Sequence, residues 1–350
     1  MYQIGRIPLI FLALATCLAL TSCNQASETP SAETASTIRA ESNTPDAPTV
    51  DTSEVIIHPD GYEEILVWSE GVRLVGRIYT PTDMQPGTKL PGLLLVNGWG
   101  GTVENTTSRY ARIFADQGYV VLTQDFKGWG KSNGPLYLNT ELPGGSESEE
   151  ITVTVQHIRH VVDPISFLAD TDAALDVLAS DPRVQSKNIG VWGTSMGGGL
   201  SLITVAKNKN VAAFVDQIGA VNHKANFFMI PERTIREAEA GVARGQIPPY
   251  PDASSKAPNL SGHPNYIALK NFEPYDYIDD INVPTLIIDA QDEEFFDRLK
   301  NGKAFYDAIK DRVDAEYMLL PGKHYDIYRE QSPKAIEAAI KWFNKYLKGE

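Results

Sequence analysis

Five residues near the middle of the chain constrain its fold more than any other stretch. Gly193-Thr194-Ser195-Met196-Gly197 has the pattern G-x-S-x-G, preceded by the apolar run 189–192 and followed by a helix-like segment. A strand that turns directly into a helix at such a pattern makes a tight bend and lifts the Ser hydroxyl clear of the sheet. Side chains at the flanking positions would collide with neighbouring backbone, which explains the two glycines. The helix N-terminus also favours developing negative charge, so Ser195 is the candidate nucleophile.

Strand-like and helix-like segments alternate through most of the remaining chain. A hairpin is expected over 64–80, with Glu70-Gly71 as its turn. Further strands are expected at 92–96, 119–123, 189–192, 211–215, 284–288 and 315–320, and helices at 108–117, 171–179, from 197 onward, 298–310 and 334–347. This alternation predicts an α/β fold whose mostly parallel sheet is covered by helices on both faces.

Two stretches interrupt this rhythm. Residues 136–162 are polar and Gly-rich, and we interpret them as a solvated loop. Residues 223–275 are long, Pro-rich and mixed in composition, which is typical of a small cap over a site, and 232–244 is its expected helix. His223 and His263 lie within this predicted cap.

The first 53 residues differ in composition from the rest. Arg6 precedes the apolar stretch 7–20, which has the length of a signal sequence rather than of a transmembrane helix. Leu20-Thr21-Ser22-Cys23 resembles the bacterial lipobox, which implies a lipid on Cys23; the alternative is an ordinary secretory signal with an incidental Cys. Residues 23–53 are rich in Ser, Thr, Ala, Pro and Glu and are expected to be a flexible tether. We therefore expect a signal peptide over 1–22 and an exported protein anchored to a bacterial membrane, the outer membrane or the cell surface.

Cysteine usage and charge exclude several classes of function. Cys17 and Cys23 are the only cysteines, so a domain that starts beyond them has no Cys nucleophile and no Cys metal ligand. The formal net charge of −14 would repel phosphate backbones, which argues against a nucleic-acid partner. His157 and His160 are spaced as a possible helical i,i+3 pair, but no carboxylate or Cys nearby completes a metal site, and we interpret them as structural.

The hydroxyl of Ser195 needs a base, because a neutral hydroxyl is a weak nucleophile. Among the six histidines, His324 in Gly322-Lys323-His324 follows the last predicted strand and precedes the closing helix. This position lies at the carboxyl edge of the sheet, where Ser195 is also expected, so His324 is the candidate base.

Several stretches together resemble the α/β-hydrolase family, in its dienelactone-hydrolase-like and acyl-peptidase-like branch. They include 72–79, Asn97-Gly98-Trp99-Gly100-Gly101, 125–132 and the chain order Ser, acid, His, and the likeness spans about 61–349. The resemblance implies an α/β-hydrolase catalytic domain over 54–350 with its cap at about 223–275. Asn97 stands where the family usually has His, but the family's oxyanion donors are backbone groups.

The resemblance also implies the remaining site residues. The triad acid would be Asp292, four residues past a strand end, although Asp289, Glu293, Glu294 and Asp297 crowd the same segment. The backbone N–H groups of Met196 and Trp99 would form the oxyanion hole.

The expected activity is hydrolysis of carboxylic esters through an acyl-enzyme, with a small ester or a short peptide as substrate and with no metal or organic cofactor. A peptidase or amidase with the same triad is one alternative, and a non-catalytic binding lipoprotein on the same fold is another. The oligomeric state does not follow from the sequence.

Overall fold

The computed structural model describes residues 58, 60–138, 141–142, 151–225, 231–246 and 260–350. The chain divides into two units, residues 1–52 and residues 53–350, and the described residues belong to the second. The predicted signal peptide, the predicted lipid site at Cys23 and the predicted tether lie outside the described residues.

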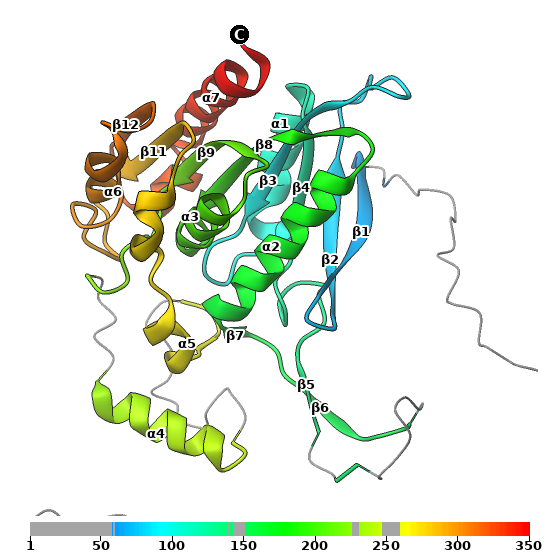
Figure 1. Ribbon diagram of the computed structural model, residues 1–350, viewed down its shortest axis with the longest axis vertical. Helices are drawn as coiled ribbons and strands as arrows, with labels where there is room; N and C mark the ends of the chain where they lie inside the picture. The colour runs from blue at the N-terminus through cyan, green and yellow to red at the C-terminus, as the bar shows by residue number, and fades with distance from the viewer. Residues whose placement is uncertain (1–57, 59, 139–140, 143–150, 226–230, 247–259) are drawn as a thin grey trace, which may run out of the picture. The chain divides into compact units, whose positions relative to one another are not determined.

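An eight-stranded sheet forms the centre of the fold, in the order β1-β2-β4-β3-β8-β9-β11-β12 (Figure 1). Its strands are β1 Tyr62–Ser69, β2 Val72–Tyr79, β3 Leu90–Val96, β4 Val120–Gln124, β8 Val184–Thr194, β9 Val211–Gln217, β11 Thr285–Ala290 and β12 Ala315–Leu320. β1 pairs with β2 and β2 with β4 in antiparallel fashion, and every later pair is parallel. The predicted mostly parallel sheet is therefore confirmed.

Helices cover both faces of this sheet (Figure 1). The described α-helices are α1 Ser108–Asp116, α2 Pro164–Ser180, α3 Met196–Lys207, α4 Glu232–Ala243, α5 Tyr266–Asn271, α6 Gly302–Ile309 and α7 Ser332–Phe343, of which α4 lies away from the sheet (Figure 1). Side chains of α2, α3 and α6 pack in one apolar cluster, and side chains of α1 and α7 pack in a second one. These two clusters are the cores on either side of the sheet.

The predicted hairpin is present and closes as its sequence requires. Ser69 pairs with Val72, so Glu70 and Gly71 form a two-residue loop, and both have positive φ angles of 48° and 76°. Two-residue loops of this kind match the twist of the flanking strands.

The bounds of α2, α6 and α7 differ from the predictions: α7 spans 332–343 rather than 334–347, and a π-helical turn, Asn344–Lys348, follows it. α2 begins at Pro164 rather than at residue 171, because Asp163 caps it by accepting a hydrogen bond from the Ser166 N–H, and Pro is favoured in the first turn. α6 is shorter than predicted, since residues 298–301 form turns before it.

The stretch 136–162, which we expected to be a solvated loop, contains short strands where the structure describes it. β5 Leu136–Leu138 pairs with β6 Val155–His157 in an antiparallel ribbon, and β7 Val161–Val162 pairs with β10 His263–Pro264. His157 lies on β6 and its Nε2 accepts a hydrogen bond from the Gly134 N–H, while His160 has φ 59°, so the two do not form a helical pair. The described residues contain no group of three side chains that could hold a metal ion.

The predicted helix of the cap corresponds to α4 (Figure 1).

Within the described part of the chain, no helix combines the length and the apolar character needed to cross a bilayer.

Candidate active site

Ser195 occupies a strained bend between β8 and α3. Its φ and ψ are 55° and −124°, a region that non-glycine residues rarely adopt. Backbone hydrogen bonds hold the bend: the Ser195 N–H donates to Gln217 O at 3.0 Å, and Ser195 O accepts from the N–H groups of Gly198 and Ala220 at 2.9 and 3.0 Å. The surrounding backbone therefore maintains the unusual conformation that presents the hydroxyl.

Both glycines of the pattern are required by close packing. A Cβ atom on Gly193 would lie 2.4 Å from the carbonyl oxygen of Gly197. A Cβ atom on Gly197 would lie 2.4 Å from the carbonyl oxygens of Val96 and Asn97. These separations are far below contact distance, so the expected collisions are confirmed.

His324 begins a short helical turn, His324–Tyr328, which follows β12 after the residues 321–323. Its imidazole Nδ1 lies 2.7 Å from Glu293 Oε2, and the exposed fractions of the two side chains are 5% and 1%. A carboxylate beside Nδ1 keeps the proton of the neutral imidazole on that nitrogen, so Nε2 is able to accept a second proton. Ser195 and His324 line one cavity of about 310 Å³.

Glu293, not Asp292, is the acid that the structure places beside His324. Asp292 is exposed, and its backbone N–H donates to Gly322 O at 2.9 Å. Together with the bond from the Gln291 N–H to Leu320 O, this bond holds the chain beside the end of β12. The side chain of the following residue, Glu293, then reaches the imidazole of His324. The Phe295 N–H donates to Glu293 Oε1 at 2.9 Å and fixes the other carboxylate oxygen.

The two expected oxyanion donors lie on the same cavity. Met196 is the first residue of α3, so its N–H has no acceptor within the helix. Trp99 follows β3, and its indole N–H donates to Ser261 O at 2.8 Å. A Cβ atom on Gly98 would lie 3.0 Å from Ser195 Cβ, which shows how closely this loop packs on the bend.

Comparison with solved structures identifies the fold. The structure of an esterase from Pyrococcus furiosus, Pf2001, matches with a TM-score of 0.55 at 15% identity, over 82% of this chain and 90% of that chain. The structure of Est1E from Butyrivibrio proteoclasticus with ferulic acid bound matches with a TM-score of 0.54 at 19% identity, over 80% and 100%. The chain has the α/β-hydrolase fold.

Sequence comparison gives matches that are consistent with this fold. Residues 74–241, just under half of the chain, match the family described as Dienelactone hydrolase family, and residues 171–317 match BAAT / Acyl-CoA thioester hydrolase C terminal. An uncharacterized 31.7 kDa protein from the traX-finO intergenic region of Escherichia coli is 24% identical over 80% of this chain and 97% of its own length.

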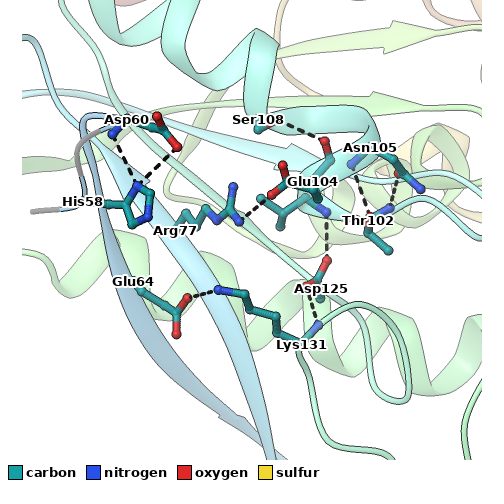
Figure 2. Close-up of polar contacts among 11 residues, drawn as sticks. His58, Asp60, Glu64, Arg77, Thr102, Glu104, Asn105, Ser108, Asp125 and Lys131 are labelled. Carbon is teal, nitrogen blue, oxygen red and sulfur yellow. Dashed lines mark hydrogen bonds and ion pairs between the residues drawn. The ribbon is translucent and has the colours of Figure 1, made fainter.

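The buried carboxylate of Asp125 anchors the segment that follows Trp99. Asp125 Oδ1 accepts from the Val103 N–H at 2.8 Å, and Asp125 Oδ2 accepts from the Lys131 N–H at 2.9 Å (Figure 2). Burial raises the pKa of Asp125, and the two backbone N–H groups oppose that shift. A Cβ atom on Gly130 would lie 2.0 Å from the carboxylate, so the turn needs Gly there.

Three further contacts fix the same segment (Figure 2). The Asn105 N–H donates to Thr102 Oγ1 at 3.3 Å, and the Thr102 N–H donates to Asn105 Oδ1 at 2.8 Å, a reciprocal cap. Arg77 forms an ion pair of 2.7 Å with Glu104, whose side chain is 78% exposed. The loop that carries Trp99 is thus joined at its far end to β2 and to the turn after β4.

Aromatic rings surround the candidate base. Phe295, Phe296 and Tyr325 approach His324 edge-on, with ring centroids 4.9, 5.9 and 5.5 Å from the imidazole. The three rings and His324 all line the cavity. Such walls exclude water and strengthen electrostatic interactions inside the site.

His223 is a cavity residue to which sequence reasoning assigned no role. It lies just after β9, beyond the Gln217–Ala220 backbone that supports Ser195. Its short-range sequence context carries no catalytic pattern, so only the folded chain places it near the nucleophile.

Proposed function

We propose that this protein is a serine hydrolase that cleaves carboxylic esters through an acyl-enzyme intermediate. The carrying observation is the buried contact of 2.7 Å between His324 Nδ1 and Glu293 Oε2, on a cavity that Ser195 also lines. The esterase among the similar structures supports the same class of reaction.

Each group has a defined part in the proposed reaction. As Ser195 Oγ forms its bond to the ester carbonyl carbon, its proton passes to His324 Nε2. The protonated imidazole is stabilised by Glu293, and it returns the proton to the leaving alcohol when the C–O bond breaks. A water molecule then repeats the sequence on the acyl-enzyme and releases the carboxylic acid.

The negative charge on the carbonyl oxygen needs donors already in place. Met196 supplies a backbone N–H at the start of α3, and Trp99 supplies the second from its loop. Fixed donors of this kind stabilise the tetrahedral intermediate more than water does, because they need no reorganisation.

Labelling with a fluorophosphonate tests the proposed nucleophile. We expect the purified domain to be labelled, Ser195→Ala to remain unlabelled, and a substitution at another buried Ser, Ser201→Ala, to retain labelling. An unlabelled wild type would point to the non-catalytic binding protein instead. Hydrolysis of p-nitrophenyl esters of graded chain length, measured beside peptide anilides, separates the ester reaction from the peptidase alternative.

The proposal includes the cellular location expected from the N-terminal sequence. Lipid on Cys23 would hold the hydrolase at a bacterial membrane after export. Fractionation of cells that express the full chain tests this: wild type should sediment with membranes, and Cys23→Ser should not. Equal distribution of the two proteins would contradict lipid anchoring.

A further inference from the structure

His223 lines the cavity and carries a buried acceptor atom without a partner in the part of the chain that the structure describes. Its Nε2 is buried and has no hydrogen-bond partner among the described residues. The same residue lines the cavity together with Ser195 and His324. A buried acceptor without a donor is unfavourable, so this atom marks a place where a ligand group can gain a hydrogen bond.

The tautomer of His223 follows from its other ring nitrogen. The side chain donates a hydrogen bond to the backbone carbonyl of Ala220, and because Nε2 has no partner, Nδ1 is the donor. Nε2 then carries a lone pair and no proton. Burial lowers the pKa of His223 to about 4, so the imidazole stays neutral at neutral pH.

His223 is held rigidly in this orientation. Its backbone N–H donates to Glu273 Oε1 at 3.1 Å, and the Lys224 N–H donates to Glu273 Oε2 at 2.6 Å. The ring packs edge-on against Phe272 with centroids 4.9 Å apart. The acceptor is therefore preorganised, and binding to it costs little conformational entropy.

Ala220, which accepts the hydrogen bond from the His223 side chain, also holds the backbone of Ser195. Ala220, whose carbonyl accepts from His223, donates its own N–H to Ser195 O at 3.0 Å. The position of the acceptor relative to the reacting centre is thus set through a short stretch of shared backbone.

We propose that His223 Nε2 accepts a hydrogen bond from an O–H or N–H group of the substrate, so that the preferred esters carry a hydroxyl or a secondary amide near the scissile carbonyl. This inference rests on the proposed ester hydrolysis and defines its substrate class. An ether at the same place brings only lone pairs to Nε2 and is rejected. Discrimination at such a site is strong because the buried protein group is otherwise left without a partner.

Matched ester pairs test the inference. The panel contains methyl butanoates with a hydroxyl at C2, C3 or C4 or an acetylamino group at C2, and 2-hydroxyethyl butanoate for the alcohol side. Each hydroxyl ester is compared with its O-methyl twin, and the acetylamino ester with its N-methyl twin. In wild type, kcat/KM for at least one donor ester should exceed that of its twin about tenfold, as expected for one hydrogen bond.

Variants at position 223 assign the preference to the imidazole. In His223→Phe the ratio for that pair should fall to near one, whereas His223→Gln should keep part of it, because the Gln side-chain oxygen can replace Nε2. His223→Leu, which needs less room, gives the same reading if the Phe variant fails to fold. Fluorophosphonate labelling and thermal unfolding of each variant report an intact site and fold.

The outcomes separate this inference from the proposed function. A wild type that takes no fluorophosphonate label and hydrolyses no ester defeats both. A labelled wild type with no donor preference anywhere in the panel overturns the role of His223 alone. A preference that persists unchanged in both His223→Phe and His223→Leu also overturns it.

Discussion

His324 Nδ1 and Glu293 Oε2 lie 2.7 Å apart, and both side chains are almost entirely withdrawn from solvent. Replacing Glu293 by Gln keeps the shape but removes the charge that stabilises the protonated imidazole and fixes its tautomer. We expect Glu293→Gln to lower kcat by about 10³–10⁴-fold with little change in KM, measured by steady-state ester hydrolysis.

Asp292 provides the matched control for this prediction. Its side chain is exposed, and its hydrogen bond to Gly322 O uses only the backbone N–H. Asp292→Asn should retain kcat within about threefold, corresponding to less than ~1 kcal/mol. A loss in Asp292→Asn as large as that in Glu293→Gln would show that the neighbouring acid carries the role.

A Cβ atom added to Gly197 would lie 2.4 Å from the carbonyl oxygens of Val96 and Asn97. Gly197→Ala forces β3 and α3 apart, and we expect it to destabilise the protein by roughly 3 kcal/mol or more and to abolish fluorophosphonate labelling. Gly87→Ala is the control, because Gly87 has φ 80° but nothing within 4 Å of an added Cβ. It should cost only the conformational strain, about 1–2 kcal/mol in urea unfolding, and should leave labelling intact.

Asp125 and Glu104 both hold the segment after Trp99, but we expect their replacement to have different effects on stability (Figure 2). Asp125→Ala leaves two backbone N–H groups without an acceptor and should destabilise the protein by about 2–4 kcal/mol and lower kcat. Glu104→Gln removes the exposed charge, but its side-chain oxygen can still accept from Arg77, so stability should change by less than ~1 kcal/mol. Equal effects of the two substitutions in urea unfolding would contradict this account.

The buried carboxyl group of Asp289 is expected to lower the free energy of unfolding as the pH rises. Burial raises the pKa of Asp289 from 3.8 to about 7, so between about pH 4 and pH 7 the folded protein holds a proton that the unfolded chain has released. Fewer protons on the unfolded state mean that the free energy of unfolding decreases with pH across this window. Asp289→Asn can still accept from the Tyr317 O–H, which donates to Asp289 Oδ2 at 2.8 Å, but it has no charge to bury.

The advantage of Asp289→Asn over wild type should therefore grow from pH 4 to pH 7 and level off above it, measured as the difference in urea unfolding free energy. Asp307→Asn is a control of opposite sign, because its exposed carboxylate has a pKa lowered by Lys303. That substitution should lose stability relative to wild type above about pH 4. A difference for Asp289→Asn that is flat across pH 4–7 would rule out the buried proton.

Local patterns predicted much of this fold because they report local physics. The Glu70-Gly71 turn, the run before Ser195 and the helix after it depend on residues close together in sequence, and all are present. The start of α2 at Pro164 was also encoded locally, by the Asp163 cap and the Pro, but its first residues lack a clear apolar period. The pairing of β5 with β6 was missed because their exposed strands have no core face to produce a pattern.

A serine at a glycine-flanked bend and a histidine after the last strand could both be predicted from chain order and local sterics. The contact of His324 with Glu293 rather than with Asp292, and the place of His223 on the cavity, depend on the folded chain. Adjacent residues in a turn point in different directions. Which of them reaches the imidazole is set by backbone bonds to β12 and the turn after it, far along the chain.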